Sequence, residues 1–303
     1  MAMKRFIIRL AVFAAIAVAL DFSVGVAFSK IREMNRGGDV YRLAQIMDSM
    51  QDDVIIMGSS RAVHHYDPFI IEDSLGMSCQ NCGFDGNGII MQYALWKEIT
   101  KRYYPKVLIY DVTPSFDLSA DYDNHRYLSR LKPFYRSNPA VDSVFWDVDK
   151  KERVKMMAQT YQYNSNCMDV LAGWIHPLWT DEGKGYKPME GKLIPKNVAK
   201  ESSSVKLEGI KVDSLKLAYF SKLIADCRKG QTQLVVVISP VYSRLEILDY
   251  SYIQRLCKEN KVLFIDYSRL FQNDNFKFSD NVHLNKDGAD CFTKVICKRL
   301  KNI

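Results

Sequence analysis

The stretch that most constrains the fold is a short apolar run that stops at a glycine. Residues 54–57 read Val-Ile-Ile-Met and are followed by Gly58-Ser59-Ser60-Arg61. A continuous apolar run of this length, rich in β-branched residues and bounded by a turn signal, predicts a strand buried on both faces of a sheet. Ligands of an open parallel sheet bind outside the carboxyl ends of its strands, so a serine placed there occupies a nucleophile's position. The alternative is a strand that simply ends in a serine-rich turn.

Four more segments with strand character alternate with segments of helical spacing. The strands are expected at 76–82, 106–112, 233–240 and 262–266, and the helices at 40–50, 89–103, 246–259 and 285–300. Alternation of this kind predicts an α/β fold with a parallel sheet and right-handed crossovers. We expect the strand order 2-1-3-4-5, with Ser60 at the edge of the switch-point crevice.

The far end of the chain supplies partners for a serine nucleophile. Asp280 stands three residues before His283, just ahead of the predicted last helix. A serine hydroxyl needs a base to take its proton, and that base must be oriented by a third group. We therefore expect Ser60, His283 and Asp280 to meet as nucleophile, base and orienting carboxylate. His64, one turn beyond Ser60 if a helix begins there, is an alternative base.

Together the two ends of the chain resemble the SGNH (GDSL-type) hydrolase superfamily. In that family a G-D-S-like block follows the first strand, and a D-x-x-H block precedes the last helix. Ser60 aligns with the nucleophile, Ser59 replaces the usual Asp, and the Asp280-x-x-His283 block fits without change. The resemblance implies a three-layer, flavodoxin-like α/β fold with a five-stranded parallel sheet.

The resemblance also implies an oxyanion hole, in which fixed N–H donors stabilise the negative charge of acyl transfer. Two donors would be the backbone N–H groups of Ser60 and of Gly86, which ends the second family block. The third block is degraded, because Phe116 stands where the family has an Asn. Thr113 and Asn87 are both candidate replacements, and the sequence does not decide between them.

Arg61 directly follows the proposed nucleophile. Its guanidinium can bind an anionic or carbonyl group of a substrate, or it can be a salt-bridged structural residue. The sequence leaves both roles open.

An apolar segment at the N-terminus is long enough to cross a bilayer. It covers residues 6–28 and is charged at Arg9 and Asp21. Arg9 can extend to the interface, whereas Asp21 is costlier and can pair with another group. We expect residues 1–30 to form an uncleaved membrane anchor. A cleaved signal peptide is the alternative, because Gly25 and Ala27 have the spacing of a cleavage site. Either way, the globular part leaves the cytoplasm, for the periplasm in a Gram-negative cell.

The remaining 31–303 are expected to form one SGNH hydrolase-like domain with an aromatic-rich insertion at about 119–204. The insertion breaks the strand–helix alternation and contains a predicted helix at 148–162. A long irregular segment inside a compact domain is typical of a functional lid, and so we expect it to flank the site. The alternative is that its aromatic residues pack a small core of their own.

Composition excludes two other classes of function. The net charge of +7 comes from dispersed Lys and Arg residues without an aromatic-studded basic stripe, so nucleic acid is not expected as a partner. His125 and His176 lack metal-ligand spacing, and Cys79-x-x-Cys82 has no second pair that would complete a zinc site. We expect no metal and no cofactor. The seven cysteines permit a disulfide outside the cytoplasm, but their odd number leaves at least one thiol free.

Gly-Ser-Ser-Arg, an N-terminal anchor and a missing third-block Asn resemble SGNH proteins attached to cell-surface polymer modification. That branch includes alginate acetylation and teichoic-acid D-alanylation proteins. It implies an acyl-ester reaction on an extracytoplasmic polysaccharide, by an esterase or an O-acyltransferase, with a membrane acyltransferase as a further candidate partner. The opposing hypothesis is a catalytically degenerate SGNH domain that binds glycan or scaffolds a membrane-bound complex.

Overall fold

The structure is a computed structural model that describes residues 2–120, 128–175, 183–194, 211–242, 250–272 and 274–301. The chain divides into two compact units. The N-terminal unit consists of Met1–Gln45 and His125–Asp181, and the sheet unit consists of Ile46–Asn124 and Glu182–Ile303. Most of the predicted insertion is thus grouped with the N-terminal segment, whereas its last described part, residues 183–194, belongs to the sheet unit.

The sheet unit is built on five parallel strands in the order β2-β1-β3-β4-β5, which confirms the predicted topology. The strands are β1 (Val54–Gly58), β2 (Cys79–Asn81), β3 (Val107–Asp111), β4 (Gln233–Ile238) and β5 (Leu263–Asp266). Every residue of the central strands β1 and β3 is buried. This is the burial that continuous apolar runs predict for strands covered on both faces.

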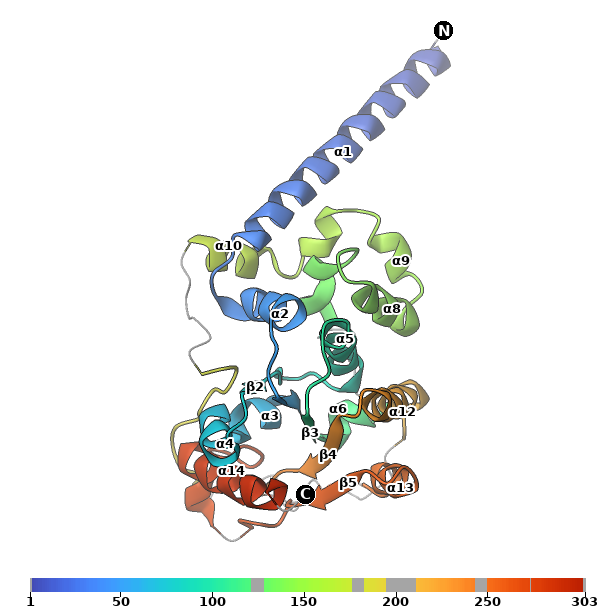
Figure 1. Cartoon of the computed structure of the whole chain (residues 1–303). Helices are drawn as coiled ribbons and strands as arrows, with labels where there is room; N and C mark the ends of the chain where they lie inside the picture. The colour runs from blue at the N-terminus through green and yellow to red at the C-terminus, as the bar shows by residue number, and fades with distance from the viewer. Residues whose placement is uncertain are drawn as a thin grey trace. The chain divides into compact units, whose positions relative to one another are not determined.

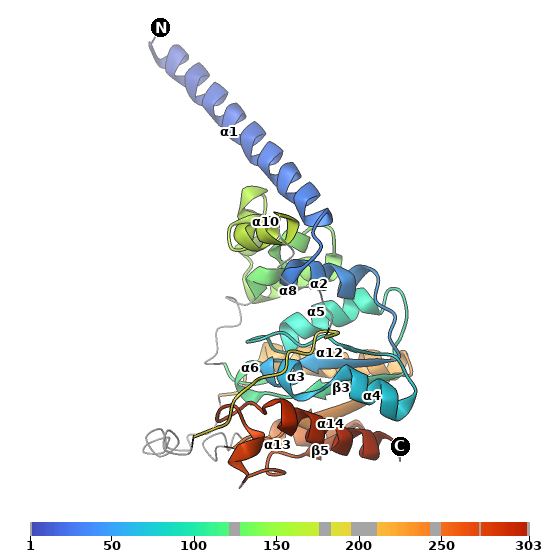
Figure 2. The ribbon, with the colours of Figure 1, turned by 90° about the vertical axis from the view of Figure 1, so that its left-hand side faces the viewer.

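Helices cover both faces of this sheet, as Figures 1 and 2 show. One face carries α3 (Ser60–His65), α4 (Pro68–Leu75) and α14 (Lys286–Leu300), and α14 packs on both of the others. The other face carries α5 (Ile89–Ile99) and α12 (Ser214–Lys229), which pack side by side; α13 (Ser251–Glu259) lies beside β5. Two short elements, α6 (Pro114–Asp117) and η5 (Asn275–Lys277), follow β3 and β5.

Sequence signals at the helix ends explain where these helices begin and stop. Asp67 caps α4 by accepting the N–H of Phe69, with Pro68 at the first helical position, and Gly76 ends the helix in the left-handed conformation. Asn285 caps α14 by accepting the N–H of Gly288. Asp213 caps α12 in the same way.

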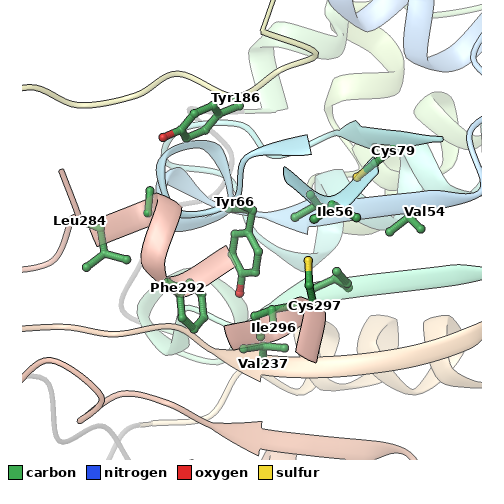
Figure 3. Packing of buried hydrophobic residues seen from close by; sticks show 14 of the residues in the cluster. Val54, Ile56, Tyr66, Cys79, Tyr186, Val237, Leu284, Phe292, Ile296 and Cys297 are labelled. Atoms are coloured by element: carbon green, nitrogen blue, oxygen red, sulfur yellow. The ribbon is translucent and has the colours of Figure 1, made fainter. Parts of the chain in front are cut away.

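The core on the α14 side of the sheet fixes the elements that carry the site. Figure 3 shows Val54 and Ile56 of β1 in one cluster with Tyr66, which follows α3, and with Phe292 and Ile296 of α14. Burying a side chain of this size stabilises the fold by about 1.5–3 kcal/mol. The same apolar contacts therefore hold the start of α3 and the start of α14 against one sheet.

The N-terminal unit is helical. It contains α1 (Ala2–Glu33), the start of α2 (Gly38–Asp48) and five short elements: η1 (Ser129–Phe134), α8 (Pro139–Val148), α9 (Glu152–Lys155), η2 (Thr160–Tyr163) and α10 (Cys167–Ile175). The predicted helix at 148–162 is wrong. Asp149 adopts an extended conformation after α8, and its carboxylate accepts the N–H of Lys151, which turns the chain.

Several aromatic residues of the insertion pack against each other inside the N-terminal unit. Tyr135 meets Phe145 edge to face at 6.3 Å, and Trp146 Nε1 donates to the hydroxyl of Tyr135 at 2.9 Å. Tyr163 stacks on Phe28 of α1 at 5.2 Å. For these residues the structure favours the alternative in which they pack a core of their own. Tyr122, Tyr127 and Trp179 lie outside the described residues.

Helix α1 is long and apolar enough to cross a membrane, by length and composition. Its large apolar side chains from Phe6 to Leu20 are exposed, and Gly25 is its buried residue. The carboxylate of Asp21 accepts the backbone N–H groups of Gln159, at 2.7 Å, and of Thr160, at 2.9 Å. The partner that this acidic residue needs is therefore backbone from the insertion.

Gly58, the last residue of β1, has the backbone conformation that most requires glycine. Its φ is +145°, and a Cβ atom there would lie 2.6 Å from the backbone oxygen of Asp111 on the neighbouring strand. We expect Gly58→Ala to lower the free energy of unfolding by about 2–3 kcal/mol, because overpacking adds to backbone strain. Urea unfolding of the full chain in detergent measures this loss.

The matched control is Gly76→Ala, at a left-handed helix end where a Cβ atom would meet nothing within 4 Å. This variant should lose only about 1 kcal/mol, the cost of the left-handed conformation. Equal losses in the two variants would show that the contact with Asp111 contributes nothing.

Candidate active site

Ser60 lies at the carboxyl end of β1, where the sequence predicted a ligand site. The strand ends at Gly58, Ser59 is the N-cap residue, and Ser60 is the first residue of α3. The strands on either side of β1 are β2 and β3. The chain crosses from β1 to β2 in one direction along the strand order and from β3 to β4 in the other, so the crossovers diverge between β1 and β3. The half-buried Ser60 therefore stands at the topological switch point.

The structure brings Ser60, His283 and Asp280 together in one chain of hydrogen bonds. Ser60 Oγ lies 2.8 Å from His283 Nε2, and His283 Nδ1 lies 2.8 Å from Asp280 Oδ2. A carboxylate only accepts, so Nδ1 carries the ring proton and Nε2 presents its lone pair to the serine hydroxyl. This is the arrangement in which a histidine can take a proton from serine.

Asp280 holds the backbone of its own loop as well as the ring of His283. Its Oδ1 accepts the N–H groups of Val282, at 2.9 Å, and of His283, at 2.8 Å. Burial acts to raise the pKa of this carboxyl, but the hydrogen bonds from the His283 ring and from these two N–H groups outweigh it. The pKa of Asp280 is therefore lowered, and the group stays ionised where it accepts from the His283 ring.

His65 lies beside these residues, and the sequence reasoning did not single it out. It is fully buried, and its Nε2 accepts the N–H of Leu284 at 3.0 Å, next to His283 in the chain. Its Nδ1 therefore carries the proton and donates to Ser239 Oγ at 2.9 Å. Burial, with the nearby charges of His283 and Arg61, holds the pKa of His65 well below its usual value, so the ring is neutral. The only sequence signal for these contacts was its place beside His64.

His64, the alternative base, is directed elsewhere. Its Nδ1 lies 2.6 Å from the carbonyl oxygen of Lys187, so this nitrogen carries the proton, and its Nε2 lies 3.4 Å from Asp85 Oδ1. The ring packs edge to face against His283, with 5.3 Å between ring centroids. The geometry favours His283 over His64 as the base for Ser60.

Residues 183–194 form a strap along the sheet unit, from β2 to the loop that carries His283. Lys184 O accepts the N–H of Asn81 in β2, Met189 O accepts that of Lys286, and Glu190 O accepts from the hydroxyl of Ser279. This strap is the described part of the predicted insertion that borders the site. It also supplies the carbonyl that fixes the tautomer of His64.

Two backbone donors expected for an oxyanion hole are available. Among the residues that the structure describes, neither the N–H of Ser60 nor that of Gly86 has an acceptor. Ser60 is the first helical residue of α3, whose N–H points out of the helix. Gly86 has a φ of +70°, a conformation that glycine adopts at no steric cost.

The candidate replacements for the third-block Asn are both buried and engaged. Thr113 Oγ1 lies 2.7 Å from Ser59 Oγ and accepts from Arg61 Nε at 3.1 Å. Asn87 donates one amide hydrogen to Asp85 O at 3.0 Å and keeps a second one. Phe116, at the family position of the Asn, lies in α6 and offers no side-chain donor.

The contacts of Arg61 favour the structural one of its two expected roles. Its side chain is 2% exposed and lies 3.5 Å from Asp111 Oδ1. Besides its bond to Thr113, it donates to the carbonyl oxygen of Val112, so it ties α3 to the end of β3. Tyr66 donates to the other oxygen of Asp111 at 2.6 Å. Burial raises the pKa of Asp111 in spite of the opposing effect of Arg61.

Asp117 holds the loop that corresponds to the third family block. Its carboxylate accepts the N–H of Thr113 and the hydroxyl of Tyr110, each at 2.7 Å. Complete burial raises the pKa of Asp117 to about 6, although these hydrogen bonds oppose the shift.

The described residues contain no group of three or more His, Cys, Asp or Glu side chains that could hold a metal ion. His125 and His176 lie outside that part of the chain. All seven cysteines are free thiols, Cys79 and Cys82 included; of the two in α14, Cys297 is buried and Cys291 is partly exposed.

Comparison with known proteins gives a likeness of fold. A scan against protein-family models and a search of curated proteins returned no match. Among solved structures, the acetyl xylan esterase AlAXEase matches with 13% identity and a TM-score of 0.40, over 82% of this chain and 99% of that one. The two-domain esterase CEX, active on acetylated mannans, matches with 11% identity and a TM-score of 0.38, over 89% of this chain and 56% of that one.

A third match is the acetyl xylan esterase Est2A from the rumen bacterium Butyrivibrio proteoclasticus, with 10% identity and a TM-score of 0.35. It covers 82% of this chain and 63% of that one. At these identities and TM-scores, the matches describe a resemblance of fold and carry no activity over to this chain.

The raised pKa of Asp117 predicts a pH dependence of stability. Between the unfolded value near 4 and the folded value of about 6, the folded state binds more protons than the unfolded state. The free energy of unfolding therefore falls as pH rises through this window, on the order of 2 kcal/mol for this group. In Asp117→Asn, whose side chain does not titrate, we expect a smaller fall. Urea unfolding from pH 4 to pH 7 tests this, and an identical profile in both proteins would contradict it.

Proposed function

We propose that this protein is a serine-dependent acyl-ester enzyme that acts on an extracytoplasmic polysaccharide. Ser60 is the nucleophile, His283 the general base and Asp280 the residue that orients the base. The observation that carries the proposal is the unbroken chain of two 2.8 Å hydrogen bonds from Ser60 Oγ through the His283 ring to Asp280. Each group in this chain can donate or accept as the proton transfer requires, because the ring proton is on the nitrogen that faces Asp280.

In the first half of the reaction, Ser60 Oγ attacks the carbonyl carbon of the acyl donor while its proton passes to His283 Nε2. The negative charge that develops on the carbonyl oxygen is met by the N–H groups of Ser60 and Gly86. Collapse of this intermediate breaks the ester bond, and the leaving alcohol takes the proton from His283. The acyl group is then held as an ester on Ser60.

In the second half, His283 removes a proton from an acceptor hydroxyl, whose oxygen attacks the carbonyl carbon of the serine ester. The bond between this carbon and Ser60 Oγ then breaks, and Ser60 takes the proton from His283. Water as acceptor gives an esterase, and a sugar hydroxyl gives an O-acyltransferase. A bound sugar has the advantage of proximity, which free water lacks. Loss of one oxyanion donor typically slows such steps about 10²–10³-fold. The missing third-block Asn therefore favours an enzyme that depends on a bound acceptor.

The proposed location of the protein outside the cytoplasm is inferred from α1. Cleavage after Ala27 would remove Asp21 and Gly25, and with them the carboxylate that caps the backbone of Gln159 and Thr160. These contacts support an uncleaved anchor, with the rest of the chain outside the cytoplasm. A glycan is then the accessible acyl acceptor or donor, and a membrane acyltransferase is a fitting source of acyl groups.

The second candidate is a degenerate domain that binds glycan or scaffolds a membrane complex without turnover. The observation in its favour is the third block, where Phe116 has no donor and Thr113 is engaged with Ser59 and Arg61. The alignment of Ser60, His283 and Asp280 weighs against it, since a binding domain has no need for a base at hydrogen-bond distance from a serine.

Labelling with a fluorophosphonate, which reacts with activated serines, separates the two candidates. We expect the wild type to be labelled and Ser60→Ala to be unlabelled. Ser59→Ala, a change at the neighbouring buried hydroxyl, should keep the label. His283→Ala should slow labelling at least about 10³-fold, and His64→Ala far less, because His283 rather than His64 faces Ser60. An unlabelled wild type would favour the degenerate domain.

Turnover of a small activated ester, with and without an oligosaccharide, tests the direction of the reaction. We expect slow hydrolysis alone and faster release of the alcohol, with formation of an acylated sugar, when the oligosaccharide is present. The double variant Ser60→Ala/His283→Ala should be little worse than either single variant, because the residues act as a unit. Fast hydrolysis that the sugar leaves unchanged would instead identify an esterase. Activity that survives Ser60→Ala would show that Ser60 is not the nucleophile.

A further inference from the structure

Helix α1 contacts the start of η2 through Asp21, and this contact bears on how deep the N-terminal unit lies in a bilayer. Besides the two backbone N–H groups, Asp21 accepts the hydroxyl of Thr160 at 2.5 Å. One turn further along α1, Gly25 lies so close to Gln159 that a Cβ atom would come within 2.3 Å of the Gln159 Cβ atom. Helix α10 also packs on α1 (Figure 1).

The length of α1 shows that these contacts fall inside the membrane if the helix spans it. Residues 6–20 rise about 22 Å at ~1.5 Å per residue, whereas the hydrocarbon core is about 30 Å thick. A span that begins at Phe6 therefore extends about four residues beyond Asp21. Tilting the helix, or beginning the span after Arg9, moves Asp21 deeper still.

Exposed apolar side chains lie on α10, which packs on α1, and on the segment that leads from α9 to the residues bonded by Asp21. Met157, in the turn before Gln159, is 67% exposed, and Val154 of α9 is 68% exposed. On α10, Met168 is 72% and Ile175 is 71% exposed, and Trp174 is exposed as well. Exposed apolar side chains on segments next to a membrane span favour contact with lipid over contact with water.

Basic side chains accompany these apolar ones. Lys150, Lys151 and Arg153 are exposed in and just before α9, and the guanidinium of Arg153 lies over the Trp146 ring at 5.0 Å. Apolar side chains beside Lys, Arg and Trp are typical of segments that lie in the headgroup region of a bilayer.

We propose that the N-terminal unit is embedded in the outer leaflet of the membrane that α1 crosses. The partner is lipid: the collar, defined as residues 154–160 and α10, inserts its apolar side chains at the boundary between acyl chains and headgroups. The proposal rests on α1 being an uncleaved membrane span, which is part of the proposed function. It adds that the protein is held by two elements, a helix and a collar.

Asp21 has a specific purpose in this arrangement. Backbone N–H groups at a helix N-terminus have no partner within the helix, and at membrane depth no water is present to bond them. The carboxylate of Asp21 supplies a partner for those of Gln159 and Thr160, and in return these donors stabilise a charge that would be costly in lipid. Each group satisfies the other, which accounts for an acidic residue within an apolar helix.

Photocrosslinking of the full chain in phosphatidylcholine–phosphatidylglycerol vesicles tests the proposal. Benzoylphenylalanine is placed at Met157 or Ile175 in the collar, at Phe13 within the span, and at Phe276, an exposed aromatic of the sheet unit. All four side chains are exposed, so the probe should not disturb folding. We expect lipid adducts at Met157 and Ile175 in yields comparable to Phe13 and several-fold above Phe276.

The pattern of adducts separates the possible failures. Adducts at Phe13 alone would confirm the span and overturn the collar. No adducts at Phe13 would overturn the span and the proposed location, while fluorophosphonate labelling of Ser60 would still decide the chemistry. Crosslinks from Met157 to a second copy of the chain, in place of lipid, would overturn the proposal in favour of a protein partner.

Discussion

The site depends on the buried polar contacts of α3, a helix of six residues between β1 and α4. Arg61 ties it to the end of β3, and His65 ties it to Ser239 after β4 and to Leu284 after β5. Ser60 contacts His283 from its first turn. The ends of β3 and β4 and the loop before α14 are thereby fixed to one short helix, so the distance between Ser60 and His283 is set by groups that are almost fully buried. Each of these contacts involves a charged or polar group without access to water, where a lost partner costs about 1–3 kcal/mol or more.

The sequence predicted the sheet and the meeting of Ser60, His283 and Asp280, because both depend on local signals. The burial of β1 and β3 follows from their apolar runs. Asp280 and His283 are close together because only two residues separate them in one loop. The contacts of His65 were missed, since a buried neutral histidine is defined by distant partners, Ser239 and Leu284. For the same reason the sequence could not choose between Thr113 and Asn87.

The insertion shows the limit of periodicity. A helix at 148–162 fits the pattern of apolar residues, but the chain turns at Asp149 and again before Gln159, where it meets Asp21 of α1. Both turns depend on carboxylates that accept backbone N–H groups. The first of them is local and was in principle visible, as an Asp two residues before the N–H that it accepts. The second turn joins residues 138 positions apart in the chain, so no local signal in the sequence indicated it.

The strap of residues 183–194 has a consequence for the behaviour of the sheet in a crowded compartment. Strand β2 is an edge of the sheet, and an unpaired edge offers a template for another chain. Here the backbone N–H of Asn81 in β2 donates to the carbonyl oxygen of Lys184. The ammonium group of Lys184 pairs with Glu72 of α4, which places a charge beside the same edge. A covered and charged edge resists strand addition, so on the β2 side the sheet is protected against aggregation by part of its own chain.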